Sequence, residues 1–172
     1  LRWSETPALA SGSLGAFDEA GAMGSWLVSN GAALYLYYIG WNVGVNVPFR
    51  NAIGLAVSTD GGQTFTRYAE GPILDRSIHD PCFVASSCVL VEGSQWRMWY
   101  LSALRWDAMF AAGGQPKPYY HIKYAESADG VRWERNGVVC IDFKSEDEHA
   151  ISRPCVLKEG GVYRMWYSYR GA

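Results

Sequence analysis

Bulky and polar residues alternate with a period of two in two similar segments. Residues 96–100 read WRMWY and residues 163–167 read YRMWY. This period predicts half-buried β-strands rather than helices. An apolar run precedes each segment, at 88–91 and 155–158, and a short glycine-containing turn joins the two. We therefore expect an antiparallel hairpin at each place.

The hairpins belong to a larger repeat. Three ten-residue windows align with an aspartate in second place: 17–26, 79–88 and 146–155. The three aspartates, Asp18, Asp80 and Asp147, are separated by 62 and then 67 residues, and the same offsets relate the aromatic strands that follow them. A repeat of this length that contains several short strands is typical of a propeller blade.

A second pair of strands follows each of the first two hairpins. The pairs are expected at 53–57 with 65–68 and at 122–125 with 131–135. Each is joined by an S-x-D-G turn, and the first of these turns fits the Asp-box pattern S-x-D-x-G-x-T-F. Serine and aspartate oxygens accept backbone N–H bonds in such turns, and glycine takes the positive φ. We interpret the turns as structural, and a catalytic role for Asp60 or Asp129 is the second interpretation.

The sequence thus predicts an all-β protein, a single partial β-propeller domain over residues 1–172. Its blades of four antiparallel strands form repeat units at about 17–75, 79–142 and 146–172, which amounts to about two and a half blades. Open strand edges associate unless they are covered. We therefore expect a homodimer or another homo-oligomer in which a second copy covers the open blade edges.

Composition narrows the possible partners. The chain has 15 basic and 17 acidic residues, for a formal net charge of −2, so no nucleic-acid partner is expected. No apolar run approaches the roughly 20 residues of a membrane helix, so no membrane partner is expected. The four cysteines lack the spacing of a zinc site, and we interpret them as buried free thiols in the cytoplasm, with no metal or cofactor. Because the sequence starts at Leu1 instead of Met, a removed signal peptide and a secreted protein stay open.

Several segments resemble uncharacterised glycosidase-like proteins. They are residues 51–58 (NAIGLAVS), the Asp-Pro pair at 80–81, the Met-Trp-Tyr strands and residues 152–156 (SRPCV). The wider superfamily contains arabinanases, invertases, levansucrases and mannoside phosphorylases, all of which are five-bladed propellers. The resemblance implies about half of such a propeller. It also implies a carbohydrate-active protein, similar to a glycoside hydrolase or phosphorylase, that acts on or binds a glycan at the propeller axis.

The resemblance also implies where the catalytic carboxyls lie. In such propellers the residues that lead into the innermost strand of each blade face the ligand, and the three aligned windows occupy that place. A glycosidase needs one protonated and one ionised carboxyl group about 5–9.5 Å apart. The candidates are Asp80, ranked first, with Asp18, Asp147 and Glu148. In the structural interpretation, which we prefer for Asp18 and Asp147, the aspartates accept hydrogen bonds at a turn.

Five further residues are candidates for substrate binding. Arg153 is suited to a hydroxyl or a phosphate, and His79 and His149 to sugar hydroxyls or phosphate. Trp41 and Trp106 come before long loops and offer flat faces to the C–H side of a sugar ring. In the structural interpretation, Arg153 joins an ion pair between blades and the histidines are satisfied rim residues. The alternative function is a non-catalytic glycan-binding or assembly module derived from a truncated propeller. The Asp-box pattern alone also suggests a sialidase, but no arginine cluster for a carboxylated substrate can be assembled from the sequence.

Overall fold

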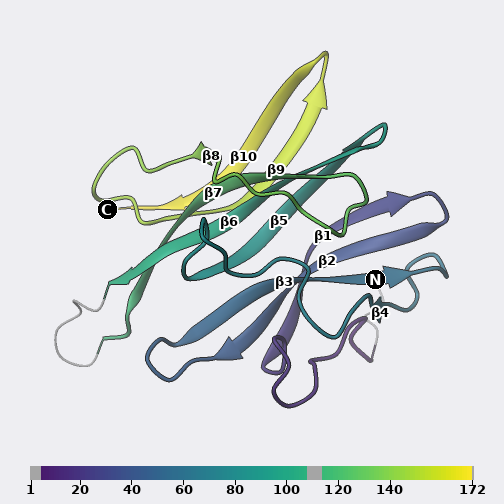
Figure 1. Cartoon of the computed structure of the whole chain (residues 1–172), viewed down its shortest axis with the longest axis horizontal. Helices are drawn as coiled ribbons and strands as arrows, with labels where there is room; N and C mark the ends of the chain where they lie inside the picture. Colours follow the sequence, from purple (N-terminus) through teal and green to yellow (C-terminus); the bar gives the residue numbers. More distant parts are fainter. Residues whose placement is uncertain (1–4, 108–113, 172) are drawn as a thin grey trace.

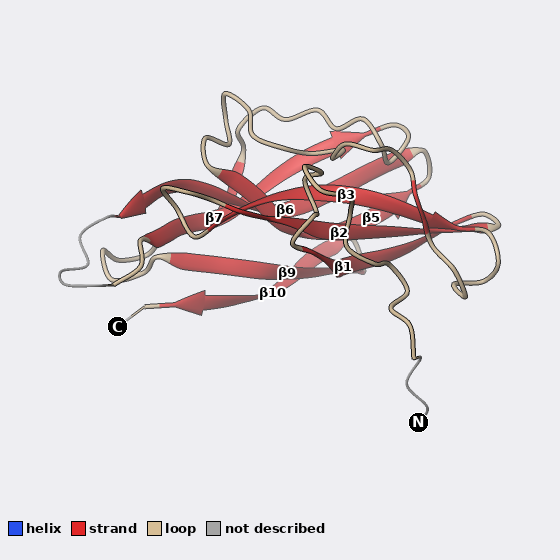
Figure 2. Cartoon of the chain, turned by 90° about the horizontal axis from the view of Figure 1, so that it is seen from below, coloured by secondary structure: helices blue, strands red, loops and turns tan. Residues whose placement is uncertain are grey.

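The computed structural model describes residues 5–107 and 114–171. All regular elements in this part of the chain are β-strands (Figure 2). The first sheet has the order β1 (Gly21–Asn30), β2 (Ala33–Val43), β3 (Phe49–Ser58) and β4 (Thr66–Arg67). The second unit repeats it with β5 (Phe83–Glu92), β6 (Gln95–Asp107), β7 (Lys117–Ser127) and β8 (Val139–Ile141). A hairpin of β9 (Ala150–Glu159) and β10 (Val162–Arg170) follows, and the all-β prediction is confirmed.

The hairpin β9–β10 begins a third blade. It joins the second sheet through a single parallel pair, Tyr120 with Ala150, whereas β5, β6 and β7 are paired along their lengths. In Figure 1 the first sheet, coloured purple to blue, lies below most of the other strands. Strand β5 contacts both β1 and β9. The first strands of the three units therefore lie side by side, as the innermost strands of propeller blades do.

The alternation of bulky residues divides each blade between two interfaces. In β6, Trp96 and Met98 pack in the apolar cluster between the first and second sheets, whereas Trp99 packs in the cluster shared with β9. Trp166 stands 67 residues after Trp99, at the same place in the repeat. Trp99 is 7% exposed but Trp166 is 55% exposed, because in β10 the corresponding face has no following blade over it among the described residues.

All three innermost strands carry a β-bulge at the same repeat position. The register shifts between Gly24 and Trp26 in β1 and between Ala85 and Cys88 in β5. In the third blade it shifts between residues 152 and 155 of β9, which pair with residues 168 and 166 of β10. Ser86 and Arg153 occupy equivalent positions in two of these bulges, with left-handed φ values of 42° and 52°. A bulge bends a strand and turns a side chain away from the regular ladder.

The last strand of the second blade differs from the prediction. The expected strand at 131–135 meets β7 only as an isolated bridge between Glu126 and Glu134, and regular pairing resumes at β8. Gly137, with a φ of 72°, lies between these two contacts and turns the backbone toward β7 again. The fourth strand is therefore split into two short contacts.

Two further features bear on the composition argument. The four cysteines form no disulfide, and Cys88 is buried as expected, but Cys140 on the short outer strand β8 is exposed, so the prediction of a buried thiol is wrong there. Within residues 5–107 and 114–171 no helix is long and apolar enough to span a membrane.

Candidate functional site

Asp80, the first-ranked catalytic candidate, is fully buried just before β5. Its carboxylate accepts hydrogen bonds from four side chains: Ser77, Tyr100, Ser102 and Arg135. The Lys123 ammonium lies 3.7 Å from Oδ1. Burial alone would raise the pKa of Asp80, but the hydrogen bonds from Ser102 and Ser77 and the charges of Lys123 and Arg135 outweigh it and hold the pKa below its usual value. The group is therefore an ionised carboxylate at neutral pH, unsuited to act as a general acid.

Asp18 has a similar arrangement in the first blade. It is 1% exposed, and Arg67 donates to its Oδ2 from Nε at 2.9 Å and from Nη2 at 2.6 Å. Arg67 and Arg135 each stand two residues after the aromatic residue that follows the S-x-D-G turn of their blade. We name this aspartate–arginine pair the blade clasp, because it ties the start of the innermost strand to the last part of the same blade.

The blade clasp was missed by sequence reasoning, although an aromatic-x-Arg signal was present in both copies. Its geometry supports the structural interpretation of Asp18, and for Asp80 it shows a carboxylate whose oxygens are already bonded. Neither aspartate lines the hollow between the innermost strands described below. A catalytic role for Asp80 and Asp18 stays a prediction.

The acidic candidates of the third window lie at the surface. Asp147 is exposed, and Glu148 is half-buried, with its Oε2 accepting a hydrogen bond from the backbone N–H of Lys144 at 2.7 Å. This contact closes the loop before β9. Glu148 thus has a local structural partner, and the catalytic role of both residues stays a prediction.

The two histidines occupy different surroundings. His79 is half-buried next to Asp80; its backbone carbonyl accepts a hydrogen bond from Lys123, and its ring lies against Gly137. The His149 ring packs edge-on against Tyr119, with 6.0 Å between centroids. Burial lowers the pKa of His149, so the ring is neutral at pH 7. The structure does not bring the two imidazoles into contact, and substrate binding by either stays a prediction.

Arg153 and Trp41 lie in one hollow between the innermost strands. This axial hollow, of about 190 Å³, is lined among others by Trp41, Asn51, Phe83, Ser86, Arg153 and Arg170. A second hollow of similar size adjoins it and shares Ser86 and Arg153. The volume of each is several times the roughly 30 Å³ that one water molecule occupies in the liquid. The bulges of β5 and β9 therefore present side chains to a common cavity.

Aromatic residues form one wall of the axial hollow. Trp41 lies 4.9 Å from the Phe49 ring centroid, and Phe49 also contacts Trp106 at 5.1 Å and Phe83 at 5.5 Å. Trp41 lines the hollow itself, and Trp106 supports the wall from behind through Phe49 and Phe83. The structure thus brings the two predicted tryptophans together. Part of the loop predicted after Trp106 lies outside the described residues.

Asn51 is a site residue that the sequence did not single out. It stands on β3 opposite Trp41, is 6% exposed, and its Oδ1 is buried without a hydrogen-bond donor among the described residues. Most buried polar atoms in proteins are paired. An unpaired acceptor on the wall of a cavity is therefore suited to a hydroxyl of a ligand.

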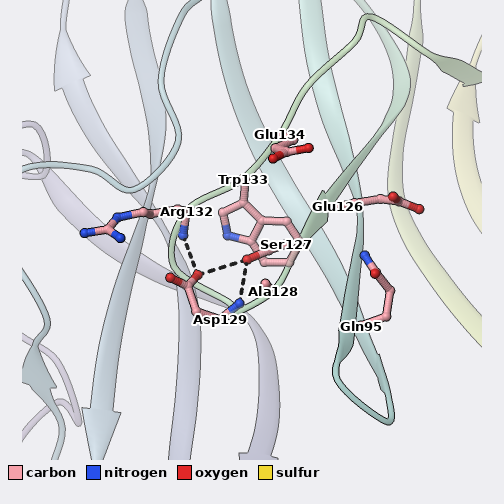
Figure 3. A pocket seen from close by; sticks show the side chains of 8 residues that line it. All are labelled: Gln95, Glu126, Ser127, Ala128, Asp129, Arg132, Trp133 and Glu134. Atoms are coloured by element: carbon pink, nitrogen blue, oxygen red, sulfur yellow. Dashed lines mark hydrogen bonds between the residues drawn. The ribbon is translucent and has the colours of Figure 1, made fainter.

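A larger hollow lies elsewhere among the described residues. It has a volume of about 470 Å³ and surrounds the S-x-D-G turn of the second blade, where Asp129 and Trp133 lie (Figure 3). The Asp129 Oδ1 accepts hydrogen bonds from Ser127 and from two backbone N–H groups of the turn, each within 3.0 Å. Glu126 is similarly held by Arg97 at 2.9 Å. These polar groups already serve the turn and the sheet, which supports the structural interpretation of Asp129.

The described residues contain no cluster of three or more His, Cys, Asp or Glu side chains that could hold a metal ion.

Comparison with known sequences yields two curated relatives. No family model matches the chain. The relatives are the uncharacterized proteins MT1551 and Rv1502 from two strains of Mycobacterium tuberculosis, each 40% identical over 166 residues, covering 96% of this chain and 54% of the relative. The chain therefore spans about half the length of the curated relatives that it matches.

Solved structures share the fold. The GH32 β-fructofuranosidase BmSUC1 of Bombyx mori superposes with a TM-score of 0.66 at 20% identity, covering 84% of this chain and 28% of that protein. The protein BT0996, solved as an RGII complex, gives a TM-score of 0.68 at 19% identity, covering 95% of this chain and 47% of that protein. Identities this low show the fold alone. The described strands thus share their fold with part of each of these proteins, and the prediction of a partial β-propeller is confirmed.

Proposed function

We propose that this chain recognises a carbohydrate in the axial hollow, as part of a propeller of the glycoside hydrolase or phosphorylase type. The observation that carries the proposal is that Trp41, Asn51 and Arg153, from two different blades, line one cavity between the innermost strands. An aromatic wall with a few polar groups is typical of sites that bind small molecules. Sugars fit such a wall because their C–H faces pack on aromatic rings while their hydroxyls need hydrogen bonds.

Arg153 is placed for recognition by its backbone. A left-handed φ is uncommon for a residue other than glycine, and such residues cluster at functional sites. Its guanidinium group is exposed and forms no ion pair with a described carboxylate, in contrast to Arg67 and Arg135. The blade-to-blade ion pair that the structural interpretation requires for Arg153 is therefore not present among the described residues.

A binding module without turnover is the second candidate function. It is favoured by the blade clasps, because one carboxylate oxygen of Asp18 and both of Asp80 accept bonds from side chains of their own blades. In the hydrolytic version of the proposal, Asp80 acts as an ionised stabilising carboxylate, and a separate carboxylic acid supplies the proton.

Binding is tested by titrating oligosaccharides into the chain and into Trp41→Ala. We expect Trp41→Ala to weaken binding by about tenfold, which corresponds to about 1.4 kcal/mol. Tyr68→Ala is the matched control, since Tyr68 is an exposed aromatic residue outside the axial hollow. Equal affinities for Trp41→Ala and Tyr68→Ala would place the sugar elsewhere and overturn the proposal.

Turnover is tested with aryl glycosides, and with oligosaccharides in the presence of phosphate. The Asp80→Asn variant is assayed at a temperature where circular dichroism shows it to be folded. Activity that survives this change would reject the catalytic assignment of Asp80. Binding without any turnover in the parent chain would favour the second candidate function.

A further inference from the structure

The axial hollow contains two arginines that lack carboxylate partners. Arg153 stands in the bulge of β9 and Arg170 ends β10, and both line the hollow. Other arginines of the described chain form ion pairs; Arg67, for example, lies 2.6 Å from the carboxylate of Asp18. No aspartate or glutamate is among the described residues that line the axial hollow. The charged side chains among the described lining residues are therefore both cationic.

Two guanidinium groups in one hollow favour an anion. Guanidinium binds carboxylate and phosphate oxygens through paired N–H donors, and these charge-assisted bonds are stronger than bonds between neutral groups. The bulge at Arg153 is part of this arrangement, because its φ of 52° holds the side chain out of the regular ladder between β9 and β10. A neutral ligand would leave the charge of both arginines without a counterpart.

Asn51 adds a requirement of the opposite kind. Its buried Oδ1 is an acceptor without a donor among the described residues, so it favours a ligand group that carries a hydrogen, such as a hydroxyl. An inorganic anion alone meets the arginines but offers little to the aromatic wall at Trp41 and Phe83. A polyol ring with an anionic substituent meets all three features.

We infer that the axial hollow selects a sugar that bears an anionic group, a phosphate or a carboxylate. Arg153 and Arg170 bind the anionic group, Asn51 Oδ1 accepts a ring hydroxyl, and Trp41 packs on the C–H face of the ring. This inference rests on the proposed function, because it names the ligand class of the same site.

The test is isothermal titration of the chain with glucose 1-phosphate, glucose 6-phosphate, glucuronate, glucose and inorganic phosphate. We expect at least one charged sugar to bind about tenfold more tightly than glucose and than inorganic phosphate, a ratio that corresponds to about 1.4 kcal/mol. The two sugar phosphates and glucuronate separate the phosphate from the carboxylate as the source of the charge.

Two variants locate the effect. Arg153→Gln should weaken binding of the charged sugar by a larger factor than binding of glucose, whereas Asn51→Ala should weaken both by similar factors. Arg132→Gln is the matched control, because Arg132 is an exposed arginine that lines the hollow at the Asp129 turn instead. Circular dichroism confirms that each variant is folded.

The outcomes separate this inference from the proposed function. Equal binding of glucose and every charged sugar, or an unchanged preference in Arg153→Gln, overturns the anionic ligand and leaves carbohydrate recognition standing. Inorganic phosphate that binds as tightly as the sugar phosphates overturns the role given to the ring. No binding of these sugars or of any oligosaccharide overturns both proposals.

Discussion

Replacing Asp80 with asparagine should destabilise the fold strongly, whatever its effect on activity. The change removes the negative charge that Arg135 and Lys123 face in a fully buried position. The asparagine can keep a carbonyl oxygen at the Oδ1 position for Ser102, but the amide group that then replaces Oδ2 carries N–H donors and cannot accept the bonds from Arg135 and Ser77. A buried cation is then left without its counter-charge.

The size of the effect follows from burial. Removing one member of a buried ion pair costs about 3–5 kcal/mol. The Arg135 side chain retains 17% of its exposure, so water partly replaces the lost carboxylate. We therefore expect the free energy of unfolding to fall by about 3 kcal/mol, at the low end of that range. For a chain of this length the melting temperature should fall by about 6–12 °C.

Urea denaturation followed by tryptophan fluorescence measures the change from the midpoint and slope. Asp147→Asn is the matched control, because Asp147 holds the same repeat position but is exposed, and it should alter stability by less than about 0.5 kcal/mol. The loss of unfolding free energy in Asp18→Asn should lie between those of the other two variants, at about 2 kcal/mol, because Arg67 is the one side-chain partner shown for Asp18. If Asp80→Asn matched the parent chain, or if Asp147→Asn lost as much, the blade clasp would not be the reason for these aspartates.

Acid titration gives the same prediction a second readout. The pKa of Asp80 is lowered in the folded chain, so between the unfolded value of about 3.9 and the folded value the unfolded state binds an extra proton. The stabilising contribution is complete above the unfolded value and is lost as the pH falls through the folded value. Stability should therefore fall less steeply with acid below about pH 5 in Asp80→Asn than in the parent chain. Identical acid limbs would contradict the stabilised carboxylate.

Three further predictions concern packing, surface charge and association. Gly54→Ala should lower the free energy of unfolding, measured in urea, by about 1–3 kcal/mol, because the added methyl group would lie 2.3 Å from the Tyr38 ring. Gly71→Ala, with nothing within 4 Å of the added methyl group, should be nearly neutral. Equal losses in the two variants would refute the packing argument. Glu92→Gln should lower the urea midpoint slightly at low salt and not at 1 M salt, because Glu92 joins cations of two blades at the surface; a salt-independent loss would argue against screening. Trp166 is 55% exposed on an open strand, so sedimentation should show association of the chain that depends on concentration. This association should weaken in Trp166→Lys. A folded, strictly monomeric parent chain would contradict coverage of the open strand by a second copy.

The repeat and its hairpins were predictable because their signals are local. The alternation around Trp96 and Trp99 indicates which side chains pack on the preceding blade and which pack on the following blade. The split fourth strand escaped prediction because a single glycine, Gly137, decides where pairing resumes. The backbone conformation of one glycine is not indicated by the pattern of hydrophobic residues.

The site was only partly predictable. Arg153 and Trp41 could be proposed from their place in the repeat, but Asn51 reaches the axial hollow through the pairing of β3 with β2, and that register is not readable from one strand. The clasp arginines lie 49 and 55 residues from their aspartates, so the pairing required the fold itself.

The bulge shared by the innermost strands separates the scaffold of this chain from its chemistry. At the equivalent repeat position of each blade the residue is Gly24, Ser86 or Arg153, which range from no side chain to a charged one, while the flanking strand pairing persists. We expect substitution there to change the lining of the cavity while the ladders on either side persist. A blade of this kind therefore combines a fixed framework with one variable position at the cavity.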